Sequence, residues 1–479
     1  MSISRPIEIF LFLTIIAASV GLLATPYSNY AILPGLAVLI FFILGRFPHI
    51  GYYLIVFLIP FHAFRTLSEA YPFLRILRIH WILGFWLLIV MFFQLLVQKK
   101  TPARLQSNLW SLLLIFFVIN LVSALMSDFY QTSFDNLFLL LIAYLFIVIS
   151  QFFLSRQDFY RTLPLILVSS ISISALLGII GYQFNLPLFA QRTVQVATYK
   201  RGFGAATDPN DLALMIIFTL PVLAHLFFSS RRRLEKNISL ISAVISITGV
   251  ILTFSRGGAI IMSVVLSLLF IKYLRKSTPK HVGFAAPLVG ITVLIIALFS
   301  PSLYWEHIQS VTDYKRETSI GRRVSYLYVA FEAFKESPIL GSGPRTFKDI
   351  YARSKYAPEY VRNREREGLT RYAHNAYLEV IVGTGILGLA VFLAIIWRSL
   401  KDFISAKKKF QLSGDKDMAS IIGAYQLSFI SLLMYFLLFS NIYHKYFLLS
   451  LALSQIAVRL SKEIPEDIIE RGENAGIIK

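Results

Sequence analysis

Long apolar runs separated by short polar segments dominate the chain. About fourteen of these runs, at roughly 15 to 23 residues each, approach the length that a bilayer-spanning α-helix needs. They are Ile7–Leu23, Ala31–Gly45, Gly51–Phe64, Trp81–Val97, Leu109–Met126, Leu137–Leu154, Leu163–Phe184, Leu212–Phe228, Ile238–Phe254, Ala259–Leu274, Phe284–Ser300, Tyr377–Trp397, Met418–Phe439 and Tyr446–Leu460. The second and third are short and could be re-entrant or tilted. The pattern therefore predicts an all-α, polytopic membrane helix bundle of about 12–14 transmembrane helices.

One long polar stretch divides this pattern into three parts. We expect transmembrane helices over residues 1–300, a long external loop over 301–374, and further transmembrane helices with a cytoplasmic tail over 375–479. Within the loop, Thr318–Lys335 has apolar side chains at helical spacing, which predicts a short helix lying against the membrane and ended by Gly341-Ser342-Gly343-Pro344. The loop has too few aliphatic residues to form a core of its own.

Lysine and arginine alternate between successive loops, and this alternation predicts the orientation. Basic residues gather in residues 99–104, 156–161, 231–236, 275–280 and 398–409. The intervening loops Ala24–Tyr30 and Ser127–Asn136 contain none. The positive-inside rule places the basic loops in the cytoplasm and the 301–374 loop on the opposite face. The same rule accounts for much of the net charge of +20, and no basic soluble domain is present, so no nucleic-acid partner is expected.

Composition agrees with a membrane protein and narrows the chemistry. Hydrophobic residues make up 56% of the chain and charged residues only 15%. The absence of cysteine excludes disulfides, thiolate metal sites and a cysteine nucleophile. No spacing of histidine and acidic residues resembles a metal site and no phosphate-binding Walker loop occurs, so neither a metal nor a cofactor is expected. A poor cleavage site after Leu23 indicates that the first apolar run is retained.

Three arginines next to glycines fall on the predicted external side. They are Arg201 in Arg201-Gly202-Phe203-Gly204, Arg256 in Ser255-Arg256-Gly257-Gly258, and Arg322 after Gly321. A guanidinium presents a fork of donors, and neighbouring glycines let backbone N–H groups approach the same oxygens, so these segments could hold a pyrophosphate. The alternative is that each arginine reaches from the membrane interface to lipid headgroups.

A histidine stands where the long polar segment meets an apolar run. His374-Asn375 directly precedes Tyr377–Trp397, so the imidazole can exchange protons with water while it faces a membrane-bound substrate. This position suits a general base, although a satisfied interfacial histidine gives the same pattern. Glu379 and the acidic residues Asp208 and Asp211 could be bases or helix caps; Asp208 or Asn210 suits an N-cap of the following helix.

Together these motifs resemble the O-antigen ligase and polymerase superfamily of bacterial glycan-assembly membrane proteins. The resemblance covers about Arg201 to Leu389. It rests on four patterns: His374-Asn375 followed by Gly385-x-x-Gly388, Arg201-x-x-Gly204 before Pro209-Asn210, the Ser255-Arg256-Gly257-Gly258 turn, and Pro338-x-x-Gly341-x-Gly343-Pro344.

The resemblance implies inverting, metal-independent transfer of a glycan from undecaprenyl pyrophosphate to an acceptor such as lipid A-core, at the periplasmic face of the bacterial inner membrane. The partners would be this lipid-linked donor, the glycan acceptor and membrane lipids. His374 would be the general base, and Arg201 and Arg256, with Arg322 as a third candidate, would bind the pyrophosphate. The supporting residues would be Asn375, Gly204, Asn210, Gly343, Gly385 and Gly388.

Two alternatives to a ligase remain open at this stage. A polymerase of the Wzy type would extend a lipid-linked repeat instead of moving the glycan to lipid A-core. A transporter or flippase of lipid-linked sugars belongs to a different class. Against it, the polar residues cluster outside the membrane, and no paired broken helices are evident.

Overall fold

The computed structural model describes residues 33–61, 79–97, 107–186, 189–192, 200–206, 208–230, 232–274, 318–357 and 369–474, with a few further positions in 13–21 and residue 105. The chain forms two compact units. Met1–Ile55 with Ile79–Lys100 make up the first, and Val56–Arg78 with Thr101–Lys479 make up the second.

The first unit contains α2 (Leu33–Arg46), α5 (Ile79–Val97) and most of α3 (Pro48–Phe57). Proline suits the first turn of α3 because the N–H that it lacks would have no helical partner there. Gly51 brings α3 close to α5, since a Cβ at this position would lie only 3.3 Å from the Leu87 side chain.

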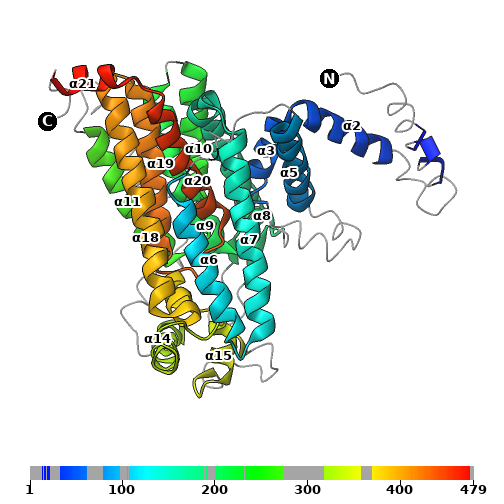
Figure 1. Cartoon of the computed structure of the whole chain (residues 1–479), viewed down its shortest axis with the longest axis vertical. Helices are drawn as coiled ribbons and strands as arrows, with labels where there is room; N and C mark the ends of the chain where they lie inside the picture. The colour runs from blue at the N-terminus through cyan, green and yellow to red at the C-terminus, as the bar shows by residue number, and fades with distance from the viewer. Residues whose placement is uncertain are drawn as a thin grey trace. The chain divides into compact units, whose positions relative to one another are not determined.

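The second unit holds a bundle of long apolar helices. Its elements are α6 (Trp110–Leu125), α7 (Tyr130–Phe153), η4 (Asp158–Thr162), α8 (Leu163–Phe184), α9 (Pro209–Ser229), α10 (Arg233–Leu252), α11 (Arg256–Leu274), α18 (Ala376–Leu412), α19 (Lys416–Tyr435), α20 (Lys445–Lys462) and α21 (Glu466–Asn474). Helix α9 is buried along nearly its whole length and packs against α8, α10, α11 and α19. Figure 1 shows α18 and α19 running alongside one another.

The prediction of an all-α membrane bundle is confirmed. In the described part of the chain, seven helices are long and apolar enough to cross a membrane, and three shorter apolar helices accompany them. Of the predicted runs, Ile7–Leu23 lies mostly outside the described residues and Phe284–Ser300 entirely so. Each of the other runs overlaps a helix, but α3 ends at Phe57, and the last residues of the run Gly51–Phe64 lie outside the described residues. The sequence analysis did not anticipate a short antiparallel hairpin, β1 (Ala190–Arg192) with β2 (Lys200–Gly202), between α8 and α9.

Helix α14 (Thr318–Glu336) forms within a residue of its predicted bounds, and α15 (Phe347–Arg353) follows it. Seen nearly end-on in Figure 1, α14 lies crosswise at one end of α18. One face of α14 shares a buried cluster with α15 and with Val382 of α18. Eight of the nine buried residues in this cluster lie within the 301–374 loop and only Val382 lies outside it, so the loop supplies most of its own apolar core, contrary to the expectation from its composition. The opposite face exposes Val324, Leu327, Tyr328 and Phe331, which suits a helix lying against a membrane surface.

The loop that follows α14 packs against α18 at a point where that helix is interrupted. Gly385 has φ +63° and ψ −164°, a conformation that interrupts the helix and that only glycine adopts readily. The break frees backbone groups on both sides. Ser342 N–H donates to Val382 O at 2.9 Å, and Ile386 N–H donates to Pro338 O at 2.9 Å. The loop and the interrupted helix therefore satisfy each other's backbone hydrogen bonds.

Candidate active site

The structure brings Arg201 to the turn between α10 and α11. Its Nε donates to Thr253 O at 2.7 Å, and its Nη2 lies 3.3 Å from Asn210 Oδ1. Both bonds fix the guanidinium at the start of α9 and the end of α10. Two of the residues predicted to form one site, Arg201 and Asn210, are thus in contact.

Arg256 stands at the N-terminus of α11, beside the carbonyl that Arg201 binds. The preceding Ser255 caps this helix, because its Oγ accepts the Gly258 N–H at 3.1 Å. Phe254 takes a left-handed φ of +52°, which makes the turn between the two helices tight. A helix N-terminus carries partial positive charge, so α11, Arg201 and Arg256 together form a region suited to anions.

Acidic residues lie next to this positive region. As predicted, Asp208 is the N-cap of α9, with its Oδ1 accepting N–H groups of Asn210 at 2.7 Å and Asp211 at 3.1 Å. Burial, followed by the neighbouring Asp211 carboxylate, raises the pKa of Asp208. Asp211 itself lies 3.3 Å from His444 Nε2, and both side chains are buried. His444 Nδ1 accepts the Tyr446 N–H, so Nε2 carries the ring proton in the neutral form and donates to Asp211.

His374 occupies a strained turn directly before α18. Its φ is +48°, a left-handed value that is uncommon for a residue with a side chain. Tyr326 of α14 lies against the imidazole, with ring centroids 6.1 Å apart and planes at 30°. Asn375 follows as the N-cap of α18, its Oδ1 accepting the N–H groups of Tyr377 and Leu378. The turn is therefore held from the helix side and from α14.

Three arginines lie near enough to His374 for their positive charges to act on its imidazole. Although part of the side chain is exposed, packing around the ring lowers its pKa to about 4, and the positive charges of Arg323, Arg322 and Arg371 add to this shift. The ring is consequently neutral at physiological pH and can accept a proton. Arg322, predicted as a phosphate ligand, thus contributes positive charge near the candidate base.

The end of α19 contacts both the segment after His374 and the residues next to Arg201. Tyr435 OH donates to Asn210 O at 2.9 Å and lies 3.2 Å from Ser255 Oγ. The next residue, Phe436, accepts the Ala376 N–H at 2.8 Å, two residues after His374. Both groups of candidate residues are therefore anchored at the same end of the bundle.

The predicted glycines occur at close backbone contacts. Gly204 packs against α8, where a Cβ would collide with Ser174 O. Gly343 donates to Gly383 O at 3.0 Å and leaves no room for a Cβ between Ser127 and Ser133. Gly388 packs on Thr384, one turn earlier in α18. These glycines shape the loops around the candidate residues without contributing side-chain chemistry.

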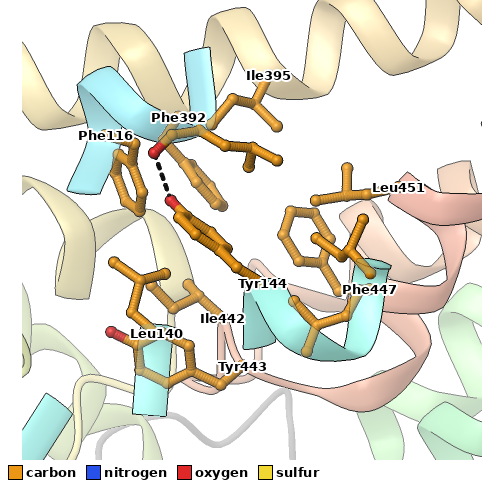
Figure 2. Close-up of a pocket in the computed structure, with 12 residues that line it drawn as sticks. Phe116, Leu140, Tyr144, Phe392, Ile395, Ile442, Tyr443, Phe447 and Leu451 are labelled. Carbon is orange, nitrogen blue, oxygen red and sulfur yellow. Dashed lines mark hydrogen bonds between the residues drawn. The ribbon is translucent and has the colours of Figure 1, made fainter. Parts of the chain in front are cut away.

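Two adjoining pockets differ in chemical character. Figure 2 shows the first, a small cavity of about 20 Å³ among apolar residues of α6, α7, α18 and α20. Its Tyr144 hydroxyl is already bonded to Leu113 O at 2.6 Å. The second, also about 20 Å³, shares Phe116, Ile442 and Tyr443 with the first but is lined by Arg345 and Glu379 as well. Only the second offers polar groups to a ligand. Within the described ranges, no group of three or more histidine and acidic side chains could hold a metal ion.

The sequence analysis missed several residues that the structure places around these sites. Arg345 follows the Gly341-x-Gly343-Pro344 motif, takes a left-handed φ of +63°, and lies over the Tyr372 ring at 5.0 Å. Tyr326 lies against the imidazole of His374, and Tyr435 donates to the carbonyl of Asn210, whose side chain bonds to Arg201. Only Arg345 had a visible signal, as an arginine adjoining a glycine-rich motif; the two tyrosines lie within apolar helical patterns.

Residues 241–393 match the family model described as O-Antigen ligase. The match includes Arg256, Arg322 and His374 and extends past Gly388, whereas Arg201 precedes it. It confirms the resemblance to the O-antigen ligase and polymerase superfamily. It also supports a multi-pass membrane protein with a ligase- or polymerase-type role on lipid-linked glycans. None of the curated proteins compared with the chain matches it significantly.

Proposed function

We propose that the protein is a glycosyltransferase that moves a glycan from undecaprenyl pyrophosphate to lipid A-core, at the periplasmic face of the bacterial inner membrane. His374 is the general base, and Arg201 and Arg256 bind the pyrophosphate, with Arg322 completing the positive charge beside the histidine. The observation that carries this proposal is a neutral imidazole, under the positive charge of nearby arginines, anchored at the same end of the bundle as Arg201 and Asn210.

The proposed reaction needs a proton acceptor and fixed positive charge. The acceptor hydroxyl attacks the anomeric carbon, the bond from this carbon to the pyrophosphate oxygen breaks, and the hydroxyl proton passes to His374. Its low pKa keeps the imidazole unprotonated, although it also limits its strength as a base. The leaving pyrophosphate gains negative charge as the bond breaks, which Arg201, Arg256 and the N-terminus of α11 would stabilise.

The acceptor distinguishes a ligase from a polymerase. The matched family description favours the ligase, because it names that activity. A ligase releases undecaprenyl pyrophosphate and forms glycosylated lipid A-core. A polymerase instead leaves a longer glycan on the carrier lipid, so the two products differ in the lipid to which the glycan is attached.

The test is transfer by purified protein in lipid nanodiscs, supplied with radiolabelled glycan on undecaprenyl pyrophosphate and with lipid A-core. We expect label on lipid A-core with wild-type protein, and a decrease of roughly 10² to 10⁴-fold in kcat for His374→Ala with little change in donor binding. His49, which is exposed on α3 in the other compact unit, provides a matched control. His49→Ala should transfer at the wild-type rate.

Two results would contradict the proposal. If His374→Ala transfers glycan as fast as wild type, then His374 is a structural residue. If wild-type protein produces only longer glycans on the carrier lipid, then the protein is a polymerase, and the proposed acceptor is wrong.

A further inference from the structure

Two side chains hold the residues that directly precede His374. Glu379, 4% exposed in the first turn of α18, accepts the Ala373 N–H at 2.8 Å through Oε1. The guanidinium carbon of Arg345 lies 5.0 Å from the centre of the Tyr372 ring. One contact therefore acts one residue before His374, and the other acts two residues before it.

The same two side chains meet in the polar pocket between α6, α18 and the segment that precedes α20. Glu379 Oε2, Arg345 Nε and Ser440 Oγ are buried there, and within the described structure none of the three makes a hydrogen bond of good geometry, although the Ser440 side chain lies near enough to Glu379 to interact with it. Arg345 also lies close enough to Glu379 for its charge to act on the carboxyl group. A pocket with donors, an acceptor and opposite charges is a suitable place for ordered water between the two side chains.

The His374 turn needs such support because its backbone is strained. A left-handed φ at a residue other than glycine raises the free energy by about 1 to 3 kcal/mol, so it persists only where surrounding contacts enforce it. Ala373 is buried, so its N–H could not exchange the Glu379 carboxylate for bulk water. Without that acceptor, the peptide before His374 would rotate and carry the imidazole with it.

We propose that Glu379 and Arg345 are positioning residues, which fix the turn at His374 so that its imidazole faces the acceptor hydroxyl. Glu379 acts through the Ala373 N–H, and Arg345 acts through Tyr372 and through its charge beside Glu379. Neither is a catalytic residue in this scheme, because their contacts reach the backbone and the ring next to His374. This inference rests on the proposed function, since it takes His374 as the base.

The test compares variants that keep or remove the hydrogen-bond acceptor at position 379. Glu379→Ala should lower kcat by about 10- to 100-fold with the KM for the lipid-linked donor unchanged, because a small displacement of a catalytic group has effects of this size. Glu379→Gln keeps an oxygen that can accept the Ala373 N–H and should transfer within about fivefold of wild type. Glu332 of α14 is exposed and pairs with Lys355 at 3.7 Å, so Glu332→Ala is a matched control that should leave kcat unchanged.

Arg345 is tested in the same assay, alone and together with Glu379. Arg345→Met should also lower kcat at constant KM. If the two residues act on one turn, the double variant Glu379→Ala/Arg345→Met should lose little more than either single variant. The double variant also removes both buried charges at once, so it keeps the test usable if a single variant folds poorly.

Three outcomes would overturn the inference. A wild-type kcat in Glu379→Ala would show that Glu379 does not position His374. An equal loss in Glu379→Gln and Glu379→Ala would assign the effect to the charge of Glu379 rather than to its bond with Ala373. Additive losses in the double variant would mean that the two residues act separately. Failure of the proposed function gives a different result, because wild-type protein and His374→Ala would then transfer glycan equally well.

Discussion

Replacing Gly385 by alanine tests the docking of the glycine loop into α18. The added Cβ would collide with the Ile339 carbonyl group and would lie 2.6 Å from Leu340 N. All three of these atoms belong to the backbone, so no side-chain rotation can relieve the contact. The new residue would also have to keep a φ of +63° and a ψ of −164°, which raises the free energy of the folded state by about 1 to 3 kcal/mol.

The loop can escape this collision only by giving up backbone hydrogen bonds. The bonds from Ser342, Gly343, Ile386 and Leu387 N–H join the two segments, and each contributes about 0.5 to 1.5 kcal/mol net. With the backbone strain included, Gly385→Ala should reduce the free energy of unfolding by about 3 to 9 kcal/mol, the upper figure if all four bonds are lost. Transfer should fall as well, because the displaced loop carries Arg345.

Gly414→Ala is the matched control for this prediction. Gly414 has a φ of +78°, but a Cβ added there would have no neighbouring atom within 4 Å, so alanine adds only backbone strain of about 1 to 2 kcal/mol. Unfolding in detergent micelles gives the free energy of unfolding of both variants. Amide hydrogen exchange at Ser342 and Ile386 reports whether the glycine loop remains docked on α18. Equal destabilisation by the two substitutions, with unchanged exchange at these amides, would refute the reasoning.

Three further predictions follow from the candidate site. Arg201→Lys and Arg256→Lys keep the positive charge but lose the planar fork of donors, so each should reduce transfer substantially while the protein still folds. Wild-type turnover in both variants would mean that the two arginines only anchor the protein at the membrane interface. The value of kcat/KM should fall as the pH decreases through about 4, where His374 becomes protonated, and this limb should vanish in His374→Ala. When the anionic donor is bound, its charge offsets that of the nearby arginines and raises the pKa of His374. The acid limb of kcat should therefore lie at higher pH than the acid limb of kcat/KM. An impermeant maleimide should label Ser354→Cys but not Ser413→Cys from outside, and the reverse would overturn the orientation.

The structure gives the topology experiment a clear geometry. Helix α18 has 37 residues and, at about 1.5 Å per residue, contains about 55 Å of helix, which exceeds the roughly 30 Å hydrocarbon core of a bilayer. Ser413 directly follows its last residue, whereas Ser354 lies after α15, near the opposite end. The two labelling positions therefore belong to opposite ends of the second unit.

Hydrophobic patterning was sufficient to predict the membrane bundle and the helix α14. A long apolar run has few alternatives to a buried helix, because its backbone polar groups must bond within the segment when no water is present. The N-cap at Asp208 was also predictable, since a short acidic side chain before a helix bonds to the nearest free N–H groups. These features depend on neighbours in the sequence or on the solvent, and both can be inferred from the chain alone.

The sequence by itself determined the helical membrane class and the residue types available for phosphate binding and proton transfer. Only the tertiary structure decided that Arg201 meets the Thr253 carbonyl, that the charges of three arginines act on His374, and that Glu379 bonds to Ala373 instead of capping the helix. It also explained the paired glycine motifs, because Gly385 interrupts α18 and the Pro338–Arg345 loop uses the freed backbone groups. Such contacts join residues far apart in the chain, and their geometry depends on how helices pack, which local pattern does not encode.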